Sequence, residues 1–553
     1  MALQDLIDAA PPGSTVSVPA GVYNEQITID KPLTLQPEPG ATVTIDATGL
    51  DSSLPTVLIL SSDVTIRDLT IQNGPFHGIQ AGNASATNLT NISIINNEIR
   101  GHANAGIITN HNASMTISDN IIENNGTGAG FNLSGIVLYP HGPTSILNNS
   151  INNNNIDGIF ARGSDAGLAI VGNIIENHLN SGITLAWDQK NTSIEFNIIN
   201  NCGSGNYDEQ GGIVIIQSMA ETIGNNVIDS CNPSGIFWGW MPTAGDPPDE
   251  ILISYNNITN SIRDGIYLFS QGPGGFIPPD QFPLEPVIKN NFLLYNGRAG
   301  VYVSNLYYYS PGNANPTINN NNIIDNEWGV FNATALTVNA IDNWWGSNTG
   351  PYHPTLNPQG TGNPVSDNVD FIPWSSNLQV FEVTGCSVQD VSLENYYISP
   401  FTNGDSKVKL VMKVTGYLEI KLTDEISAFL PFDIWFTKNF IMQIPELNNI
   451  KPVITATSAC NASLIGSVIY IEMELGVVVD IEGKRTILIS AIGPSSPRPN
   501  IPDFNIQKKK PRKAKKNKCQ TNPIEECINA QVIFASCEFK QSLLKTIDLS
   551  ELM

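Results

Sequence analysis

Isolated acidic and basic residues are the side chains of this sequence that could do acid–base chemistry. Two carboxylates about 5–10 Å apart can cleave a glycosidic bond. A base with a near-neutral pKa, helped by a cation, can instead remove a proton beside a sugar carboxylate. Isolated acids are more often turn caps, and that alternative stays open. The closest clusters are Arg263 with Asp264, Asp188 with Lys190, Asp208 with Glu209, and Arg162 with Asp165. From these clusters the candidate catalytic residues are Asp264, Arg263, Asp188 and Asp208.

Aromatic residues at one repeated position form a second candidate site. A Gly followed by Ile or Val recurs at Gly78, Gly106, Gly135, Gly158, Gly182, Gly212, Gly235, Gly265, Gly300 and Gly329. In a strand the aliphatic residue would point inward and the next residue outward. Half of these next residues are aromatic, and two tryptophans lie just beyond their strands. The predicted sugar-binding residues are Phe160, Trp187, Phe237, Trp240, Tyr267, Tyr302 and Phe331. Their rings could stack on sugars, or they could pack under loops as a satellite core.

The metal-binding residue types show no ligand spacing. Seven cysteines in 553 residues are too few for a disulfide scaffold. None of their spacings is CxxC, which argues against zinc. Stacked repeats could bring His77 and His102 together, an arrangement that would suit copper or zinc, although turn or surface roles are commoner for histidine. We predict no metal site and no cofactor. Calcium remains possible, because it could bridge the acidic protein surface and an acidic sugar.

The net charge of −24 belongs to the first part of the chain. Residues 1–375 hold 8 Lys and Arg against 32 Asp and Glu, and residues 376–553 hold 19 of each. This acidity argues against nucleic acid as a partner, because phosphates need cationic neutralisation. No run of about 20 apolar residues predicts a membrane span. The first residues carry Asp5 and Asp8 and no long apolar run, so we expect no signal peptide in this chain.

An internal repeat organises residues 1–375. The repeated glycines are 23 to 35 residues apart. A second series of asparagines between aliphatic residues interleaves with them: Asn97, Asn120, Asn149, Asn173, Asn197, Asn226, Asn256, Asn291, Asn321 and Asn343. Short apolar alternations bounded by Asn and Gly indicate strands and turns, and such a unit is typical of one coil of a parallel β-helix. Stacked asparagines would then bond the buried peptide groups of the turns.

Here a family resemblance becomes specific. TVSVPAGVYNEQITIDKPLTLQPEPGATVTID (residues 15–46), the Gly-Ile and Asn-Ile repeats, and DNWWGSNTGP (residues 342–351) resemble right-handed parallel β-helix repeat proteins. The resemblance is to the NosD-like, carbohydrate-binding and sugar-hydrolase group of the pectate-lyase superfamily. It implies this fold over about residues 1–375, with a saccharide groove on the aromatic sheet. That superfamily includes lyases, hydrolases, epimerases and non-catalytic members. The polygalacturonase pattern and an epimerase-like DPHD are absent, and the nearest fragment is YPHG at Tyr139–Gly142.

The predicted fold class is all-β, a right-handed parallel β-helix followed by an antiparallel β-sandwich-like domain. The expected parts are an N-terminal capping helix (1–14), the β-helix (15–375), the antiparallel β-domain (378–495), a basic linker (496–518) and a C-terminal tail (519–553). The sharper alternation after residue 378, as in VKLVMKVTGYLEIKL and SVIYIEMELGVVVDI, indicates antiparallel strands with one buried face. The order of these segments resembles a sporulation-associated SPOCS-type β-domain.

Three functions remain open from the sequence. The first is a non-catalytic structural or carbohydrate-binding protein of the cell surface or spore outer layer, with the C-terminal domain as its assembly domain. The second is a polysaccharide lyase, hydrolase or epimerase that works in the same groove. The third is a metal-delivery accessory protein of the NosD type. The expected partners are polysaccharide or surface-layer proteins, and the C-terminal region is where copies of the chain would join as a homo-oligomer.

Overall fold

The structure is a computed structural model. It describes residues 2–109, 111–129, 132–204, 207–239, 251–270, 284–305, 314–376, 382–400, 406–423, 426–442, 451–465, 468–482, 487–488 and 536–548. The chain divides into two compact units, residues 1–379 and 380–553, and each is described by itself. No helix within these ranges is long and apolar enough to cross a membrane.

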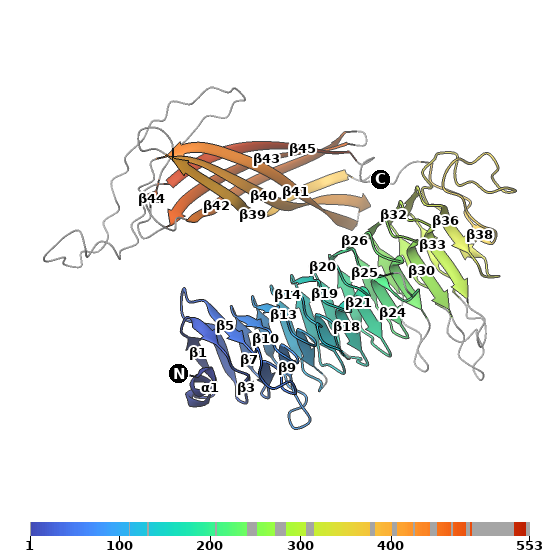
Figure 1. Cartoon of the computed structure of the whole chain (residues 1–553). Coiled ribbons are helices and arrows are strands. Elements are labelled where there is room, and N and C mark those ends of the chain that lie inside the picture. Colours follow the sequence, from blue (N-terminus) through green and yellow to red (C-terminus); the bar gives the residue numbers. More distant parts are fainter. Residues whose placement is uncertain are drawn as a thin grey trace. The chain divides into compact units, whose positions relative to one another are not determined.

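Unit 1 is built from three parallel sheets, here called A, B and C, which take strands in turn (Figure 1). Sheet A contains β1 (Ser14–Val18), β4 (Leu33–Pro37), β7 (Val64–Arg67), β10 (Ile92–Ile95), β13 (Met115–Ser118), β16 (Thr144–Leu147), β19 (Leu168–Val171), β22 (Thr192–Glu195), β25 (Thr222–Gly224), β28 (Leu252–Ser254), β31 (Val287–Lys289), β34 (Thr317–Asn319), β37 (Val338–Asn339) and β38 (Val369–Asp370). Sheet B contains β2 (Gly21–Tyr23), β5 (Val43–Asp46), β8 (Thr70–Gln72), β11 (Glu98–Arg100), β14 (Ile121–Glu123), β17 (Ser150–Asn152), β20 (Ile174–Glu176), β23 (Ile198–Asn200), β26 (Val227–Asp229), β29 (Asn257–Thr259), β32 (Phe292–Leu294) and β35 (Asn322–Ile324). Sheet C contains β3 (Ile27–Ile29), β6 (Val57–Ile59), β9 (Ile79–Ala81), β12 (Ile107–Thr109), β15 (Ile136–Leu138), β18 (Asp157–Arg162), β21 (Ser181–Ala186), β24 (Gly211–Ile216), β27 (Ser234–Gly239), β30 (Asp264–Ser270), β33 (Ala299–Asn305) and β36 (Trp328–Asn332).

This arrangement confirms the predicted parallel β-helix. One strand from each sheet makes a coil, and each strand pairs in parallel with the same strand of the next coil, as Ile107 does with Ile136 and Ile136 with Ile159. The inward Ile, Val and Leu side chains stack into one continuous buried core. Because every coil contributes the same few aliphatic positions, this core is a column along the whole of unit 1.

The asparagine ladder lies in the turn between sheets A and B. Each of the ten asparagines is almost fully buried, as predicted. The amide nitrogen of Asn173 donates to Ile146 O at 2.9 Å and to Asn197 Oδ1 at 3.0 Å. Its own Oδ1 accepts from the backbone and side-chain nitrogens of Asn149, both at 2.9 Å. The residue before the ladder position adopts positive φ, for example 54° at Asn148 and 56° at Asn225. In several coils the turn therefore contains two asparagines, the buried ladder residue and the positive-φ residue before it.

A second stack lies in the turn between sheets B and C, and the sequence did not reveal it. Its members follow the inward residue of sheet B by three positions, and all are buried: His102, Asn125, Asn154, His178, Cys202, Cys231, Ser261, Asn296 and Asn326. Asn125 Nδ2 donates to Asn154 Oδ1 at 3.0 Å, and Asn296 Nδ2 donates to Asn326 Oδ1 at 3.0 Å. Because four residue types share the position, no single repeat letter marks it.

Both ends of the core are covered. The helix α1 (Leu3–Ala9) buries Leu3 and Ile7 against the first coils. At the other end Trp345 is fully buried beside Gly329, whereas Trp344 is only half-buried. The indole of Trp345 therefore closes this end of the core.

Unit 2 is antiparallel. Its strands are β39 (Glu382–Pro400), β40 (Ser406–Thr423), β41 (Ile426–Met442), β42 (Lys451–Ile465), β43 (Val468–Glu482), β44 (Ile487–Leu488) and β45 (Ser536–Asp548). One sheet has the order β39-β40-β41, and in the other β43 pairs with β42, β44 and β45. The disulfide Cys386–Cys460 joins β39 to β42 and so links the two sheets. Strand β45 comes from the segment that we expected to be a separate tail.

Candidate functional site

The predicted aromatic row exists on the outer face of sheet C. In register across four coils, Phe237 pairs with Tyr267, Tyr267 with Tyr302, and Tyr302 with Phe331. The centroids of successive rings are 5.2, 5.1 and 5.4 Å apart. Each repeat thus adds one ring at the spacing of one coil, as the Gly-Ile spacing indicated.

Exposure divides this row. The side chains of Phe237 and Tyr267 are 2% and 4% exposed, and they pack with Val214 in a cluster separate from the main core. Tyr302 and Phe331 are half-buried. Burial favours the packing alternative for Phe237 and Tyr267, since a ring covered by protein offers no face to a sugar. The predicted sugar-binding residue Trp240 lies outside the described residues.

A charge network lies beside this row. Asp264, fully buried, receives two hydrogen bonds from Arg298, from Nε at 2.8 Å and from Nη2 at 2.5 Å. The Arg298 guanidinium carbon lies 3.6 Å from the ring centroid of Tyr302 and 5.5 Å from that of Tyr267. Burial lowers the pKa of Arg298, but the hydrogen bond and charge of Asp264 outweigh it and raise that pKa. Burial raises the pKa of Asp264 above its usual value, although the hydrogen bonds and the charge of Arg298 lower it.

The other candidate catalytic residues separate into two places. Arg263 forms an ion pair with Asp208, and the charges of both residues act on Asp264, so three of the four candidates belong to one network. Asp188 does not join them. It is exposed beside Trp187, and its neighbour Lys190 pairs with Asp165 at 3.5 Å instead. The sequence suggested Lys190 with Asp188 and Arg162 with Asp165, and the structure corrects both pairings.

A second cluster on sheet C does present aromatic surface to solvent. Trp187 is 50% exposed and follows β21 with a φ of 47°. Its ring centroid lies 6.1 Å from that of Phe160, which lies 5.8 Å from that of Tyr139. Phe160 and Tyr139 are half-buried. We call these three rings the Trp187 platform.

Arg162 lies among the rings of the Trp187 platform. Its guanidinium carbon is 4.1 Å from the Tyr139 centroid and 5.3 Å from the Trp187 centroid. Within the part of the chain that the structure describes, its guanidinium makes no ion pair and no hydrogen bond. Stacking therefore holds the Arg162 guanidinium at the platform, and its N–H donors remain available to a ligand.

Asp157 is the acid closest to this platform along the strand. It begins β18, and its Oδ1 accepts hydrogen bonds from Asn180 Nδ2 at 2.8 Å and from Thr184 Oγ1 at 3.0 Å. Thr184 is the register neighbour of Phe160 in the next coil. Burial raises the pKa of Asp157 to about 6, although hydrogen bonds from Asn180, Thr184 and Ser134 lower it. This carboxyl titrates near neutral pH.

The two buried acids of sheet C are too distant to act as a pair. Register connects Asp157 through Ser181, Gly211 and Ser234 to Asp264. Four coils at about 4.8 Å each place them roughly 19 Å apart. A glycosidase pair needs about 5–10 Å.

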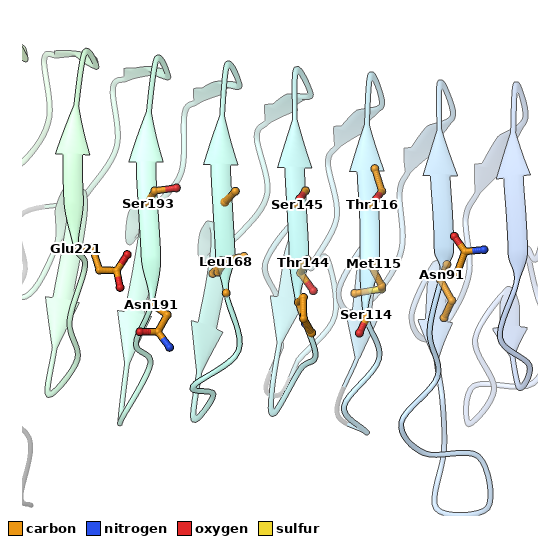
Figure 2. A pocket seen from close by; sticks show the side chains of 14 residues that line it. Asn91, Ser114, Met115, Thr116, Thr144, Ser145, Leu168, Asn191, Ser193 and Glu221 are labelled. Atoms are coloured by element: carbon orange, nitrogen blue, oxygen red, sulfur yellow. The ribbon is translucent and has the colours of Figure 1, made fainter. Parts of the chain in front are cut away.

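An open groove of about 420 Å³ runs along the outer face of sheet A. In Figure 2, Thr116, Ser145 and Ser193 lie at the same level of their strands, and Glu221 stands at one end. The floor is a row of small side chains, since Ala169 fills the position between Ser145 and Ser193. Its lining contains one carboxylate and no aromatic ring, so it offers neither a catalytic pair nor a stacking surface.

The histidines give no metal centre among the described residues, where no three His, Cys, Asp or Glu side chains gather as ligands. His77 and His102 do interact across neighbouring coils, and burial lowers the pKa of each to about 4. His102 Nδ1 contacts Asn125 Oδ1 at 2.9 Å, so this ring takes part in the second turn stack. The packing of the turn between sheets B and C therefore explains why a histidine is buried at position 102.

Two functional-site residues escaped the sequence-based selection. Arg298, the partner of Asp264, stands two residues before Gly300 just as Arg263 stands two before Gly265, so aligned repeats could have revealed it. Arg162 was noted only as a partner of Asp165. Its stacking on Tyr139 depends on a strand of the preceding coil, and that relation follows from register alone.

Comparison with known proteins places the fold. The family model described as a right handed beta helix region matches residues 38–175 and 132–244. The A-module of mannuronan C-5 epimerase AlgE4 from Azotobacter vinelandii is 18% identical, with a TM-score of 0.43 over 59% of this chain and 90% of that chain. The Dettilon tailspike protein is 11% identical, with a TM-score of 0.39 over 86% and 84%. An alpha-1,3-glucanase from Streptomyces thermodiastaticus is 15% identical, with a TM-score of 0.35 over 67% and 65%.

No curated protein sequence matches the chain significantly. The matched family model and the three parallel sheets agree on the architecture. Unit 1 therefore has a right-handed parallel β-helix fold.

Proposed function

We propose that the chain binds a glycan on the outer face of sheet C, at the Trp187 platform. The observation that carries this proposal is the half-exposed indole of Trp187 beside Phe160. Aromatic faces pair with the apolar C–H faces of sugars, and each aromatic contact is typically worth about 0.5–1.5 kcal/mol.

The position of the platform suits a long ligand. The rings come from three consecutive coils, β15, β18 and β21, so they lie along the axis of the β-helix. An extended sugar chain could pass from ring to ring in that direction. A cell-surface or spore-layer protein that holds polysaccharide is the setting we propose for this binding, with unit 2 as its assembly domain.

A glycan array on the full chain tests the proposal. Trp187→Asn removes the indole, and Asn tolerates the positive φ at this position without added strain. The matched control is Tyr352→Ala, which removes another exposed ring far along the chain. We expect the wild type and the control to bind the same glycans and Trp187→Asn to lose most of that binding. Binding that survives Trp187→Asn, or its absence in the wild type, would contradict the proposal.

A second candidate function is catalysis on the bound glycan, and Asp157 favours it. A carboxyl whose pKa is about 6 can both give and take a proton near neutral pH. Buried carboxyls with such values gather at functional sites, although structural networks also produce them. We therefore propose a test of turnover, in which glycans that bind are incubated with the wild type and with Asp157→Asn. Cleavage or epimerisation that Asp157→Asn abolishes would establish the enzyme.

A further inference from the structure

We propose that Arg162 selects an anionic glycan, one that bears a carboxylate or a sulfate at the platform. This inference rests on the proposed glycan binding at the Trp187 platform and adds the chemical class of the ligand. It runs against the overall charge of the chain, because residues 1–375 carry a large excess of acids. The argument comes from the local geometry of one guanidinium.

Two arginines of sheet C are stacked on tyrosine, and their difference is informative. Arg298 lies over Tyr302, and its donors are satisfied by the buried carboxylate of Asp264. Arg162 lies over Tyr139 at a similar distance, yet no carboxylate of the described chain reaches it. Arg298 is thus a closed ion pair, whereas Arg162 has the same stacked arrangement with the place of the anion unfilled.

The acidic residues near Arg162 in the sequence form no ion pair with it, because they have other partners or lie exposed. Asp165 pairs with Lys190 at 3.5 Å. Asp157 is buried and receives its hydrogen bonds from Asn180, Thr184 and Ser134. The exposed Asp188 forms no ion pair within the described ranges. A ligand anion would therefore not have to displace an existing partner of Arg162.

The stacking also prepares the guanidinium for recognition. An unstacked arginine loses side-chain freedom when it binds, and this loss weakens the binding. The rings of Tyr139 and Trp187 already restrict Arg162. Its planar fork matches the two oxygens of a carboxylate or a sulfate, which a lysine ammonium cannot do. A sugar lying on the Trp187 platform would bring such a group within reach.

Calorimetric titration of the full chain with three matched ligands tests this inference. The ligands are a neutral glucan, the same glucan oxidised to the carboxylate at C6, and the same glucan sulfated. We expect the wild type to prefer one anionic form by a factor on the order of ten, as for a single charge-assisted hydrogen-bonded pair. The preferred arm identifies the anion, and sodium chloride should reduce the preference.

Three variants complete the test. In Arg162→Gln the ratio of anionic to neutral affinity should fall to about one, and in Arg162→Lys it should fall part of the way. Lys190→Gln removes a nearby cation that already has a partner, and it should keep the wild-type ratio. A wild type that binds the neutral glucan equally well, or a preference that survives Arg162→Gln, overturns the inference while glycan binding stands. A wild type that binds none of the three ligands overturns both.

Discussion

The repeated glycine is required by space and not by backbone conformation. A Cβ on Gly182 would lie 2.6 Å from Ile199 Cγ2 and 2.8 Å from Gly212 O, and the other inward glycines meet the next coil in the same way. Gly182 directly precedes the core residue Ile183, and the space beside it is filled by Ile199 and the backbone of Gly212, both in the next coil.

Gly182→Ala should therefore destabilise unit 1 by about 1–3 kcal/mol, as overpacked cores do. The matched control is Gly167→Ala, where an added Cβ would meet no atom within 4 Å. That change should be neutral or slightly stabilising, since Ala restricts the unfolded chain. Denaturant unfolding of the three proteins measures the difference. Equal losses at the two positions would contradict the spatial explanation.

Asp157 makes a prediction about pH. Its pKa rises from 3.8 in the unfolded chain to about 6 in the fold, so the folded state binds the proton more tightly. The associated stability is complete below about pH 4 and is lost as pH rises through 6. The loss amounts to about 3 kcal/mol at 1.36 kcal/mol per unit of pKa. Asp157→Asn keeps a neutral side chain at every pH.

We expect the free energy of unfolding of Asp157→Asn to rise relative to that of the wild type as pH increases from about 4 to about 6, and the difference to level off at higher pH. Unfolding curves at several pH values check this, with Asp165→Asn as the control at an exposed acid. If the difference in unfolding free energy between Asp157→Asn and the wild type does not change with pH, the carboxyl of Asp157 is ionised in the folded protein over the whole range.

At the level of the turn, a constant residue type decided what the sequence could predict. The ladder asparagines share one residue type, so their recurrence in the sequence predicted both the length of a coil and its buried turn. The second turn uses Asn, His, Cys and Ser at one position, and its pattern is visible only after the coils are aligned. The outward direction of the aromatic row followed from strand alternation. Its burial did not, because exposure depends on what covers a side chain and not on which way it points.

The ladder itself can be tested at its centre. Asn173→Leu keeps the volume but leaves the amide of Asn149 and the carbonyl of Ile146 without their partners. Each buried unsatisfied group costs roughly 1–3 kcal/mol, so we expect a loss of at least that size in unfolding free energy. Asn348→Leu, at an exposed position outside the ladder, should change stability by less than about 0.5 kcal/mol. Similar losses in both variants would mean that the ladder contributes nothing special.

At the scale of the whole molecule, the sequence distinguished two kinds of β-structure but did not assign the final strand to unit 2. In unit 1 each coil is one copy of the sequence repeat, so the position of its strands can be predicted from that copy alone. In unit 2 the partner of β43 comes from a segment more than 50 residues later in the chain, and alternation within one strand says nothing about its partner. The β-domain expected over residues 378–495 therefore omitted β45.

Strand β45 should be necessary for the stability of unit 2. It pairs with β43 from Val468 to Val479, and without it this apolar stretch would be an open sheet edge. Open, long apolar edges pair with other chains. We expect residues 380–553 to unfold cooperatively when expressed alone, and residues 380–535, which end just before the final strand, to self-associate and melt at a lower temperature. Thermal unfolding followed by circular dichroism, together with size-exclusion chromatography, compares the two fragments. If the shorter fragment stays monomeric and equally stable, β45 is an accessory to unit 2 and the disulfide-linked sheets suffice.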